Sequence, residues 1–185
     1  MAGEGLSCGG EIPGVDRDGT REKSGMTIER ATLSDAEEIL SLQKLAYRSE
    51  AEIYGDFSIP PLLQTLEEIR KDFENQVLLK ATFDGKIIGS VRAFVREGTC
   101  YIGRLIVHPD LQNQGIGAEL MRGIEETFKE ARRFELFTGH KSEKNLHLYE
   151  KLGYRVFKTV KANERLNIVF LEKIKLTKEG RSRGR

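Results

Sequence analysis

This chain has little cysteine and no long apolar run, and its charges of opposite sign nearly cancel. Its cysteines, Cys8 and Cys100, lie far apart without ligand residues at metal-binding spacing, which argues against a disulfide framework or a metal site. No apolar run approaches the roughly 18 residues that cross a bilayer, and the N-terminus lacks the apolar core of a secretory signal. The formal charge of +1 provides no overall basic field for nucleic acid. These absences predict a reduced, cytoplasmic protein that binds neither metal, membrane nor nucleic acid.

What is present is the composition of one globular domain between two polar ends. A chain of 185 residues is long enough to bury a substantial core without disulfides. Residues 1–25 are rich in glycine and charge and lack apolar periodicity, which predicts a disordered tail. Residues 26–176 are predicted to form the folded domain, and residues 177–185 a basic tail. That basic tail is compatible with a solvated end or with a docking arm for an anion.

Between the tails, apolar residues follow the periods of strands and helices in turn. Ser34 followed by Glu37 predicts a capping box and the start of a helix, and a second helix is expected after Pro60-Pro61. Asp84-Gly85 predicts a hairpin turn between two strands. The expected strands are 26–31, 77–83, 86–95, 100–107, 134–138, 154–160 and 166–173, of which 77–83 and 86–95 form this hairpin. Two more helices are expected at 116–128 and 143–152. This order predicts an α/β fold of the α+β kind, a mixed sheet with helices on its faces.

The loop between the strand at 100–107 and the helix that follows it is the most informative segment. At such a junction several unpaired backbone N–H groups converge, and the helix dipole favours a negatively charged group such as a phosphate. The pattern is not a Rossmann fingerprint, because Leu120 occupies the third glycine position. It is not a Walker loop either, since no Gly-Lys-Ser/Thr follows. The local pattern leaves a phosphate-binding loop and an unspecialised turn both open.

Two segments together resemble the signatures of the GNAT N-acetyltransferase superfamily. The first is Gln112-x-x-Gly115-x-Gly117, which follows a strand ending in Leu-Ile-Val-His-Pro. The second is the run Asn-Leu-His-Leu-Tyr-Glu-Lys-Leu-Gly-Tyr at 145–154. The resemblance spans roughly residues 26–175. It implies a central, mostly antiparallel sheet that is splayed between its fourth and fifth strands, with helices on both faces.

The resemblance also implies how acetyl-CoA, the cosubstrate, is bound. The pantetheine arm is expected to lie in the splayed gap and to pair with the backbone of Leu105, Ile106 and Val107. Asn145 is expected to reach the pantetheine or the acetyl end, and no metal is implied. The pyrophosphate is expected to meet the backbone amides of Gln112, Asn113, Gln114, Gly115, Ile116 and Gly117.

The chemistry of acetyl transfer assigns roles to a few further residues. Tyr149 matches the family tyrosine that donates a hydrogen bond or proton to the departing sulfur, although packing on the sheet is an alternative role. Arg104 stands where many members carry a glutamate, and Ser142 where many carry an asparagine, which weakens that contact. Cys100 lacks a histidine partner, so the amine is expected to attack acetyl-CoA directly. The general base stays open among Glu97, Glu50, Glu52, His108 and ordered water.

The acceptor is expected to contact the segment 48–57, which is acidic and aromatic, unless that segment is a solvated loop. Tyr54 and Phe57 are candidates for stacking on a cationic amine that Glu50, Glu52 and Asp56 attract. Arg92 and Arg104 favour instead an acceptor that carries a carboxylate. The prediction is therefore an N-acetyltransferase for a primary amine of a small molecule or peptide; the alternative is an acyl-CoA-binding module without turnover. The resemblance also implies a homodimer formed through 166–173.

Overall fold

The structure, a computed structural model, describes residues 25–175, so the two predicted tails lie essentially outside the described residues. Seven strands form one sheet, in which only the central pair β4 and β5 is parallel. The predicted mixed and mostly antiparallel sheet is thereby confirmed. In spatial order the strands are β1 (Thr27–Arg30), β2 (Val77–Phe83), β3 (Lys86–Arg96), β4 (Thr99–Val107), β5 (Arg133–Gly139), β7 (Asn167–Ile174) and β6 (Arg155–Lys161).

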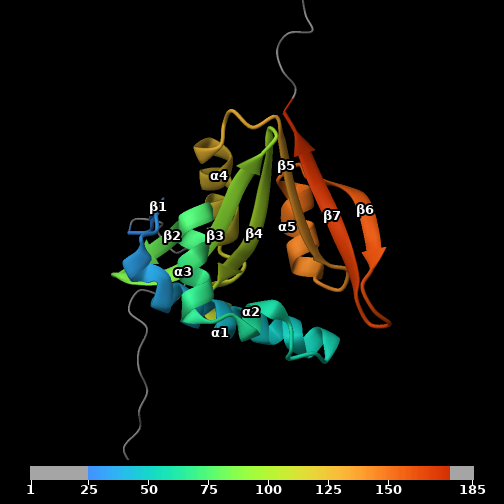
Figure 1. The fold of residues 1–185 in the computed structure, drawn as a ribbon, viewed down its shortest axis with the longest axis horizontal. Helices are drawn as coiled ribbons and strands as arrows, with labels where there is room; N and C mark the ends of the chain where they lie inside the picture. Colours follow the sequence, from blue (N-terminus) through green and yellow to red (C-terminus); the bar gives the residue numbers. More distant parts are fainter. Residues whose placement is uncertain (1–24, 176–185) are drawn as a thin grey trace, which may run out of the picture.

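β4 and β5 are paired at one end only. Their ladder comprises Thr99 with Arg133, Cys100 with Phe134 and Tyr101 with Glu135, and it stops there. In Figure 1 the two strands lie together at the top of the sheet and part below, with β3 flanking one and β7 the other. Among residues 25–175, the part of β4 beyond Tyr101 therefore has no strand partner on its β5 side. The predicted splay between the fourth and fifth strands is confirmed.

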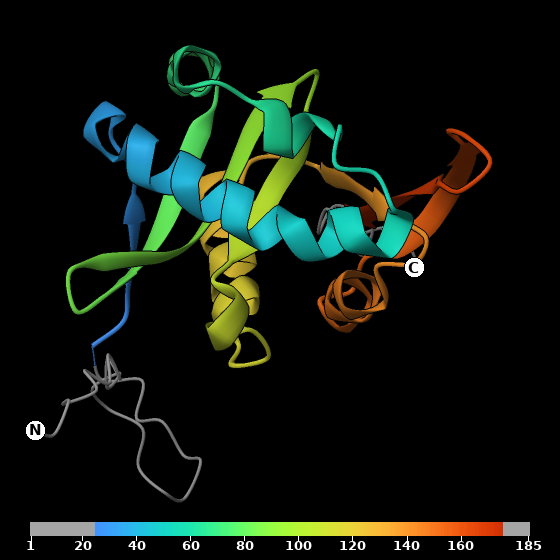
Figure 2. The same cartoon turned by 90° about the horizontal axis from the view of Figure 1, so that it is seen from below.

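Helices cover both faces of the sheet, as Figure 2 shows. One face carries α1 (Ala36–Tyr54), α2 (Pro60–Leu63) and α3 (Leu66–Asn75). The other face carries α4 (Ile116–Thr127) and α5 (Glu143–Lys151). Two 3-10 turns, η1 (Leu33–Asp35) and η2 (Pro109–Leu111), precede α1 and α4.

Each face of the sheet has its own apolar core. α4 buries one stripe at helical spacing, namely Ile116, Leu120, Met121 and Ile124, against the sheet. The same core contains Cys100 and Tyr149. The core on the opposite face is built chiefly from α1, α3 and the sheet, with Ile39 and Ile69 at its centre. These two cores fix the helices on either side of the strands that part.

The start of α1 differs from the prediction. The capping box joins Thr32 and Asp35, where the Thr32 N–H donates to the Asp35 carboxylate at 2.7 Å, and Asp35 is itself the N-cap of α1. The predicted box of Ser34 and Glu37 is wrong, because the chain first makes the η1 turn and is capped there, two residues earlier.

The predicted single helix after Pro60-Pro61 is divided in two. α2 ends at Leu63, and α3 begins after Thr65, whose N–H donates to Glu68 at 2.7 Å while its hydroxyl accepts from the Glu68 N–H at 3.2 Å. This reciprocal capping box makes a helix start inside the expected helix.

The segment 48–57 is also largely helical rather than a loop. α1 continues to Tyr54 and ends at Gly55, whose φ of +63° favours glycine. No proline or glycine interrupts the helix before that residue.

Candidate active site

The loop that leads into α4 begins with a tight turn. The His108 ring accepts a hydrogen bond from the Asp110 N–H at 3.4 Å, so His108 caps this turn. The Gln112 N–H donates to the Pro109 carbonyl at 3.4 Å and is thus already engaged. The first amides of α4 have no acceptor within the helix, as at every helix N-terminus. They are the backbone donors that this loop offers to an anion.

The two loop glycines are required for different reasons. Gly115 has a φ of +84°, a conformation that is strained for any residue with a side chain. A Cβ added there would meet nothing within 4 Å, so the space around Gly115 is open. A Cβ on Gly117 would lie 3.2 Å from a methyl carbon of Leu148 on α5. Gly115 thus shapes an accessible loop, whereas Gly117 allows α4 and α5 to approach each other. The first role supports the predicted close approach of a phosphate; the second is a packing role that the sequence did not indicate.

β4 is interrupted by a bulge just before the residues predicted to bind pantetheine. The register with β3 shifts between the pair Arg92–Gly103 and the pair Ser90–Ile106. Arg104 lies in this bulge with a φ of +51°, a left-handed conformation that is strained for a residue with a side chain. After it, Ile106 is buried, while Leu105 and Val107 are half-buried. The bulge therefore redirects the strand at the point where β4 and β5 have parted.

Tyr149 lies on α5 and is buried against the sheet. Its ring centroid is 6.1 Å from that of Tyr154. Burial raises the pKa of the Tyr149 phenol, and the nearby Tyr47 and Glu50 raise it further. The phenol is consequently protonated at neutral pH and is able to donate a hydrogen bond or a proton.

Glu50 comes from the opposite face of the sheet and meets the start of α5. The buried Ser142 hydroxyl donates a hydrogen bond to its carboxylate, which links α1 to the N-cap of α5. The other candidate bases lie elsewhere: Glu97 is exposed in the turn before β4, Glu52 is exposed on α1, and His108 caps the η2 turn. Of the four side chains considered as bases, Glu50 is the one that contacts the N-cap of α5 and whose charge raises the pKa of Tyr149.

Tyr47 and Arg104 complete this group of side chains. The Arg104 guanidinium carbon lies 5.7 Å from the centroid of the Tyr47 ring. Burial raises the pKa of Tyr47, against the opposing positive charges of Arg104 and Arg92. Tyr47 was not singled out from the sequence, although its position three residues before Glu50 places both on one face of α1. We call Tyr47, Glu50, Arg104, Ser142 and Tyr149 the junction cluster.

Arg92, a predicted acceptor residue, is engaged within the protein. Its guanidinium donates to the Asp72 carboxylate on α3. Asp72 also accepts from the Gln64 and Gln76 side-chain amides, at 2.6 and 3.2 Å. A cavity of about 10 Å³ separates Arg92 and Arg104 from the underside of α1, room for about one water molecule. The geometry gives Arg92 a structural contact with α3.

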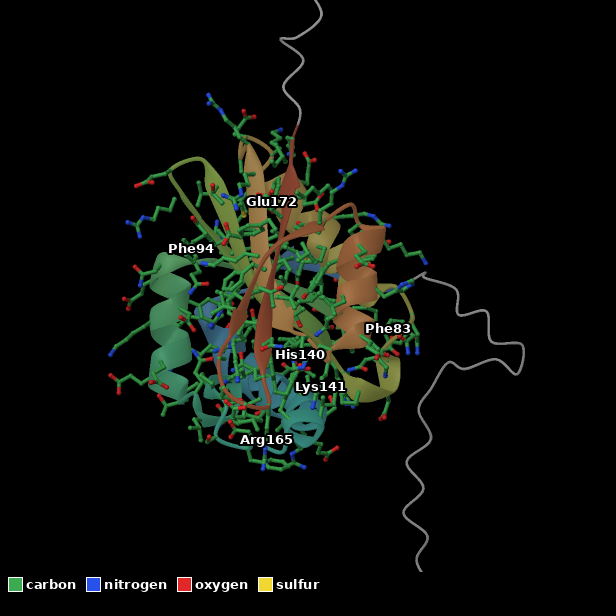
Figure 3. All side chains as sticks on the ribbon, turned by 90° about the vertical axis from the view of Figure 1, so that its right-hand side faces the viewer. Phe83, Phe94, His140, Lys141, Arg165 and Glu172 are labelled. Atoms are coloured by element: carbon green, nitrogen blue, oxygen red, sulfur yellow. The ribbon has the colours of Figure 1, made fainter. Side chains whose placement is uncertain are left out.

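The remaining predicted residues are arranged around the end of α1. Tyr54 is buried; its hydroxyl accepts the Lys141 N–H at 2.7 Å and its ring lies 5.8 Å from the His140 ring. Figure 3 shows His140 and Lys141 beside the last turns of α1. Phe57 is 59% exposed beyond that helix. Asn145 is half-buried in the first turn of α5, and its N–H donates to the Ser142 carbonyl at 3.0 Å. Tyr54 therefore holds α1 against the β5–α5 loop.

Residues 25–175 contain no group of three or more histidine, cysteine, aspartate or glutamate side chains that is able to hold a metal ion. Within the same range, no helix has the length and apolarity needed to cross a membrane.

Comparisons with known proteins give one consistent result. A model of the acetyltransferase (GNAT) family matches residues 37–154. The fold is similar to that of the PaiA N-acetyltransferase of Thermoplasma acidophilum in complex with coenzyme A, with a TM-score of 0.69 at 16% identity over 81% of this chain and 99% of that one. It is also similar to the ribosomal-protein-S18-alanine N-acetyltransferase of Escherichia coli, with a TM-score of 0.68 at 16% identity over 84% and 97% of the two chains.

The chain is also similar in sequence to a curated protein that is longer than the chain. The chain is 32% identical over 131 residues to the UPF0157 protein YqkA of Bacillus subtilis. The match covers 71% of this chain but 38% of YqkA, so the chain corresponds to under half of that protein's length.

Proposed function

The chain belongs to the acetyltransferase (GNAT) family, and on that premise we propose that it transfers the acetyl group of acetyl-CoA directly to a primary amine of a small molecule or peptide. The observation that carries the proposal is a buried, protonated Tyr149 on α5 together with Glu50, which is hydrogen-bonded to the N-cap of the same helix and whose charge raises the pKa of Tyr149. The phenol is suited to donate a hydrogen bond, and the carboxylate to accept a proton.

The residues around the splay fit the donor. β4 beyond Tyr101 offers backbone groups that no strand of the described chain takes on the β5 side, which suits the amide-rich pantetheine arm at Leu105 to Val107. The amides at the start of α4 and the open space at Gly115 suit a pyrophosphate. Acetyl-CoA bound in this way supplies a thioester whose carbonyl carbon accepts the amine and whose sulfur departs with the bonding electrons.

Two side chains then assist the transfer, one at the amine and one at the departing sulfur. An acceptor amine with a lysine-like pKa of about 10.4 arrives mostly protonated, and Glu50 receives that proton directly or through a water. Tyr149 donates a hydrogen bond to the departing sulfur, which leaves as a thiolate with a pKa of about 8.5 by analogy with cysteine. Cys100 takes no part, because burial raises the pKa of its thiol to about 12 and it lies in the apolar core.

Replacing Tyr149 tests the proposed hydrogen bond to the sulfur. In an acetyl-CoA-dependent thiol-release assay with a panel of amines, Tyr149→Phe is expected to lower kcat by about 100-fold, the effect of removing one positioned donor from the charge that develops in the transition state. Tyr154→Phe is the matched control, since it removes a neighbouring buried phenol. The Tyr154 hydroxyl donates a hydrogen bond to Glu125 at 3.0 Å. That variant is expected to lose stability and keep its rate. Equal rates for wild type and Tyr149→Phe would remove Tyr149 from the mechanism.

Replacing Glu50 tests the proposed base. Glu50→Gln keeps an acceptor for the Ser142 hydroxyl but cannot take a proton, so kcat/KM near neutral pH is expected to fall by about 100-fold. The deficit should shrink as the pH rises toward the pKa of the amine, because more acceptor is then already deprotonated. Glu52→Gln, on the exposed side of α1, serves as the control. A deficit that is independent of pH would assign Glu50 a structural role instead.

The second candidate function is an acyl-CoA-binding module without turnover. It is favoured by Arg104, which occupies the position where many relatives carry a carboxylate. This alternative predicts that CoA raises the melting temperature while no amine releases thiol. Thiol release with any amine in the panel excludes it.

A further inference from the structure

Two opposite charges of the junction cluster lie beside Tyr47 without pairing with each other. Glu50 follows Tyr47 by one turn of α1, and Arg104 faces the Tyr47 ring from β4. Both charges act on the pKa of Tyr47, in opposite directions. Within residues 25–175, no carboxylate oxygen lies within 4.0 Å of a charged Arg104 nitrogen. Glu50 is bonded to Ser142 rather than to an arginine.

The described chain provides Arg104 with no carboxylate and leaves one of its hydrogen-bond donors without an acceptor. Its Nε is buried and has no hydrogen-bond partner among the described residues. A buried donor without an acceptor is costly, and an arginine presents its donors in a fork that suits a carboxylate. Arg104 is also held at a φ of +51° by the bulge, a strained conformation of the kind that occurs at binding sites.

Arg92 provides the internal comparison. It lies along the same cavity as Arg104, but its guanidinium is neutralised by Asp72 on α3. The protein therefore supplies a carboxylate for one arginine and none for the other. The arginine without a carboxylate is Arg104, which lies beside Tyr47.

We propose that the acceptor is a zwitterion of the α-amino-acid class, whose carboxylate binds Arg104 and whose amine faces Glu50. This inference rests on the proposed function and narrows its acceptor. Glu50 and Arg104 both act on Tyr47, so the two charges lie on either side of one ring, which suits an acceptor whose amine and carboxylate are close together. An amine without a carboxylate leaves the Arg104 charge without a counter-ion.

The test uses matched sets of acceptors with the full-length chain. Each set comprises an α-amino acid, its amide and the corresponding decarboxylated amine, which differ only in the carboxylate. Thiol release gives kcat/KM for each, and calorimetric titration of the amino acid into CoA-loaded protein reports binding without turnover. The acid is expected to exceed its amide and amine by about 10- to 100-fold in kcat/KM, the usual effect of charge-assisted hydrogen bonds.

Arg104 variants assign that preference to this side chain. Arg104→Gln is expected to abolish the preference by slowing only the acids, and Arg104→Lys to restore part of it, because lysine keeps the charge without the fork. Arg96→Gln, at an exposed arginine near the end of β3, is the control and should retain the full preference.

Several results would overturn the inference while leaving acetyl transfer intact. One is an amine or amide that reacts as fast as its acid in wild type. Another is an Arg104→Gln variant that slows all three acceptors equally, which would place Arg104 at the charge developing on the thioester oxygen. If no acceptor releases thiol, the proposed function fails, and the calorimetric titration then tests the binding site by itself. Amino-acid binding that is lost in Arg104→Gln would support the zwitterion site. The absence of amino-acid binding to the wild-type protein would refute it.

Discussion

Individual polar side chains stabilise this domain where they link segments distant in sequence. Asp35, at the start of α1, binds Lys80 of β2 at 2.9 Å. Burial by itself raises the pKa of the Asp35 carboxyl, but the Thr32 N–H and the Lys80 ammonium outweigh burial and hold the pKa below its usual value. The hydrogen bond to Asp35 correspondingly raises the pKa of Lys80. This pair fastens the start of α1 to the sheet.

Asp35→Asn should therefore destabilise the domain in a pH-dependent way. A carboxyl whose folded pKa is depressed stabilises above its unfolded pKa, about 3.9, and that stability is lost as the pH falls through the folded value. We expect a loss of about 1 kcal/mol in the free energy of unfolding at neutral pH that narrows below about pH 4. Urea unfolding across this range measures it. Glu126→Gln, in an exposed surface pair, is the control, and a pH-independent deficit would contradict the assignment.

Residue roles were the part of the site that the sequence predicted least well. Tyr149 stood out by its motif, but Tyr54 and Arg92 were considered for the acceptor and are engaged in contacts within the protein. Sequence spacing cannot reveal that Asp72, twenty residues from Arg92, neutralises its charge. The roles proposed for the loop residues and for Asn145 stay predictions.

At the scale of secondary-structure elements, α3 is attached to the sheet by an ion pair with little solvent exposure. Arg92 on β3 binds Asp72 on α3, and both side chains are largely shielded from water. Gln64, in the break between α2 and α3, shares that carboxylate and also accepts from Gln43 on α1 at 2.8 Å. The network thus joins three helices to the strand beside the site.

Removing one partner of this pair is expected to be costly. Asp72→Asn leaves the Arg92 charge shielded from water and unpaired, so we expect a loss of about 3 kcal/mol in the free energy of unfolding. Glu67→Gln on the same helix breaks an exposed pair with Lys71 and should cost less than about 1 kcal/mol. Urea unfolding of both variants makes the comparison. Similar losses would show that the Arg92–Asp72 pair stabilises no more than a surface contact.

Element types were predicted well and element limits less well. Alternation and helical spacing are local properties, so the strands 77–83 and 100–107 and the helix from Ile116 were all found. The break before α3 was missed although Thr65 and Glu68 carry its signal, because the apolar spacing from Leu62 to Phe73 continues across it. The length of α1 was missed because its acidic end resembles a loop in composition.

At the scale of the whole molecule, the predicted dimer surface has a different geometry from the one expected. β7 contains the residues predicted to pair between subunits, but it is paired on both sides, with β5 and with β6. The outer strand at this end of the sheet is β6, whose residues Val156 and Phe157 are exposed. A homodimer stays a prediction, and strand-to-strand pairing at this end of the sheet would have to use β6.

The molecule as a whole should be stabilised by coenzyme A. The proposed site takes groups from both halves of the splayed sheet, so a ligand bound there holds the halves together and binds only the folded state. At 100 times its dissociation constant, CoA is expected to add about 2.7 kcal/mol to the free energy of unfolding. Thermal unfolding measures this, with pantetheine, which lacks the pyrophosphate, as the weaker comparison ligand. An unchanged melting temperature at saturating CoA would contradict the site.

The sequence by itself determined the order of elements, the mixed sheet and the family, because periodicity and the two motifs are local patterns along the chain. The tertiary structure decided which side chains meet: Glu50 with Ser142, Arg92 with Asp72, and Arg104 with Tyr47. These contacts join opposite faces of the sheet or strands to helices far along the chain. The contact of Glu50 with Ser142 exists because α1 extends far enough to reach the start of α5.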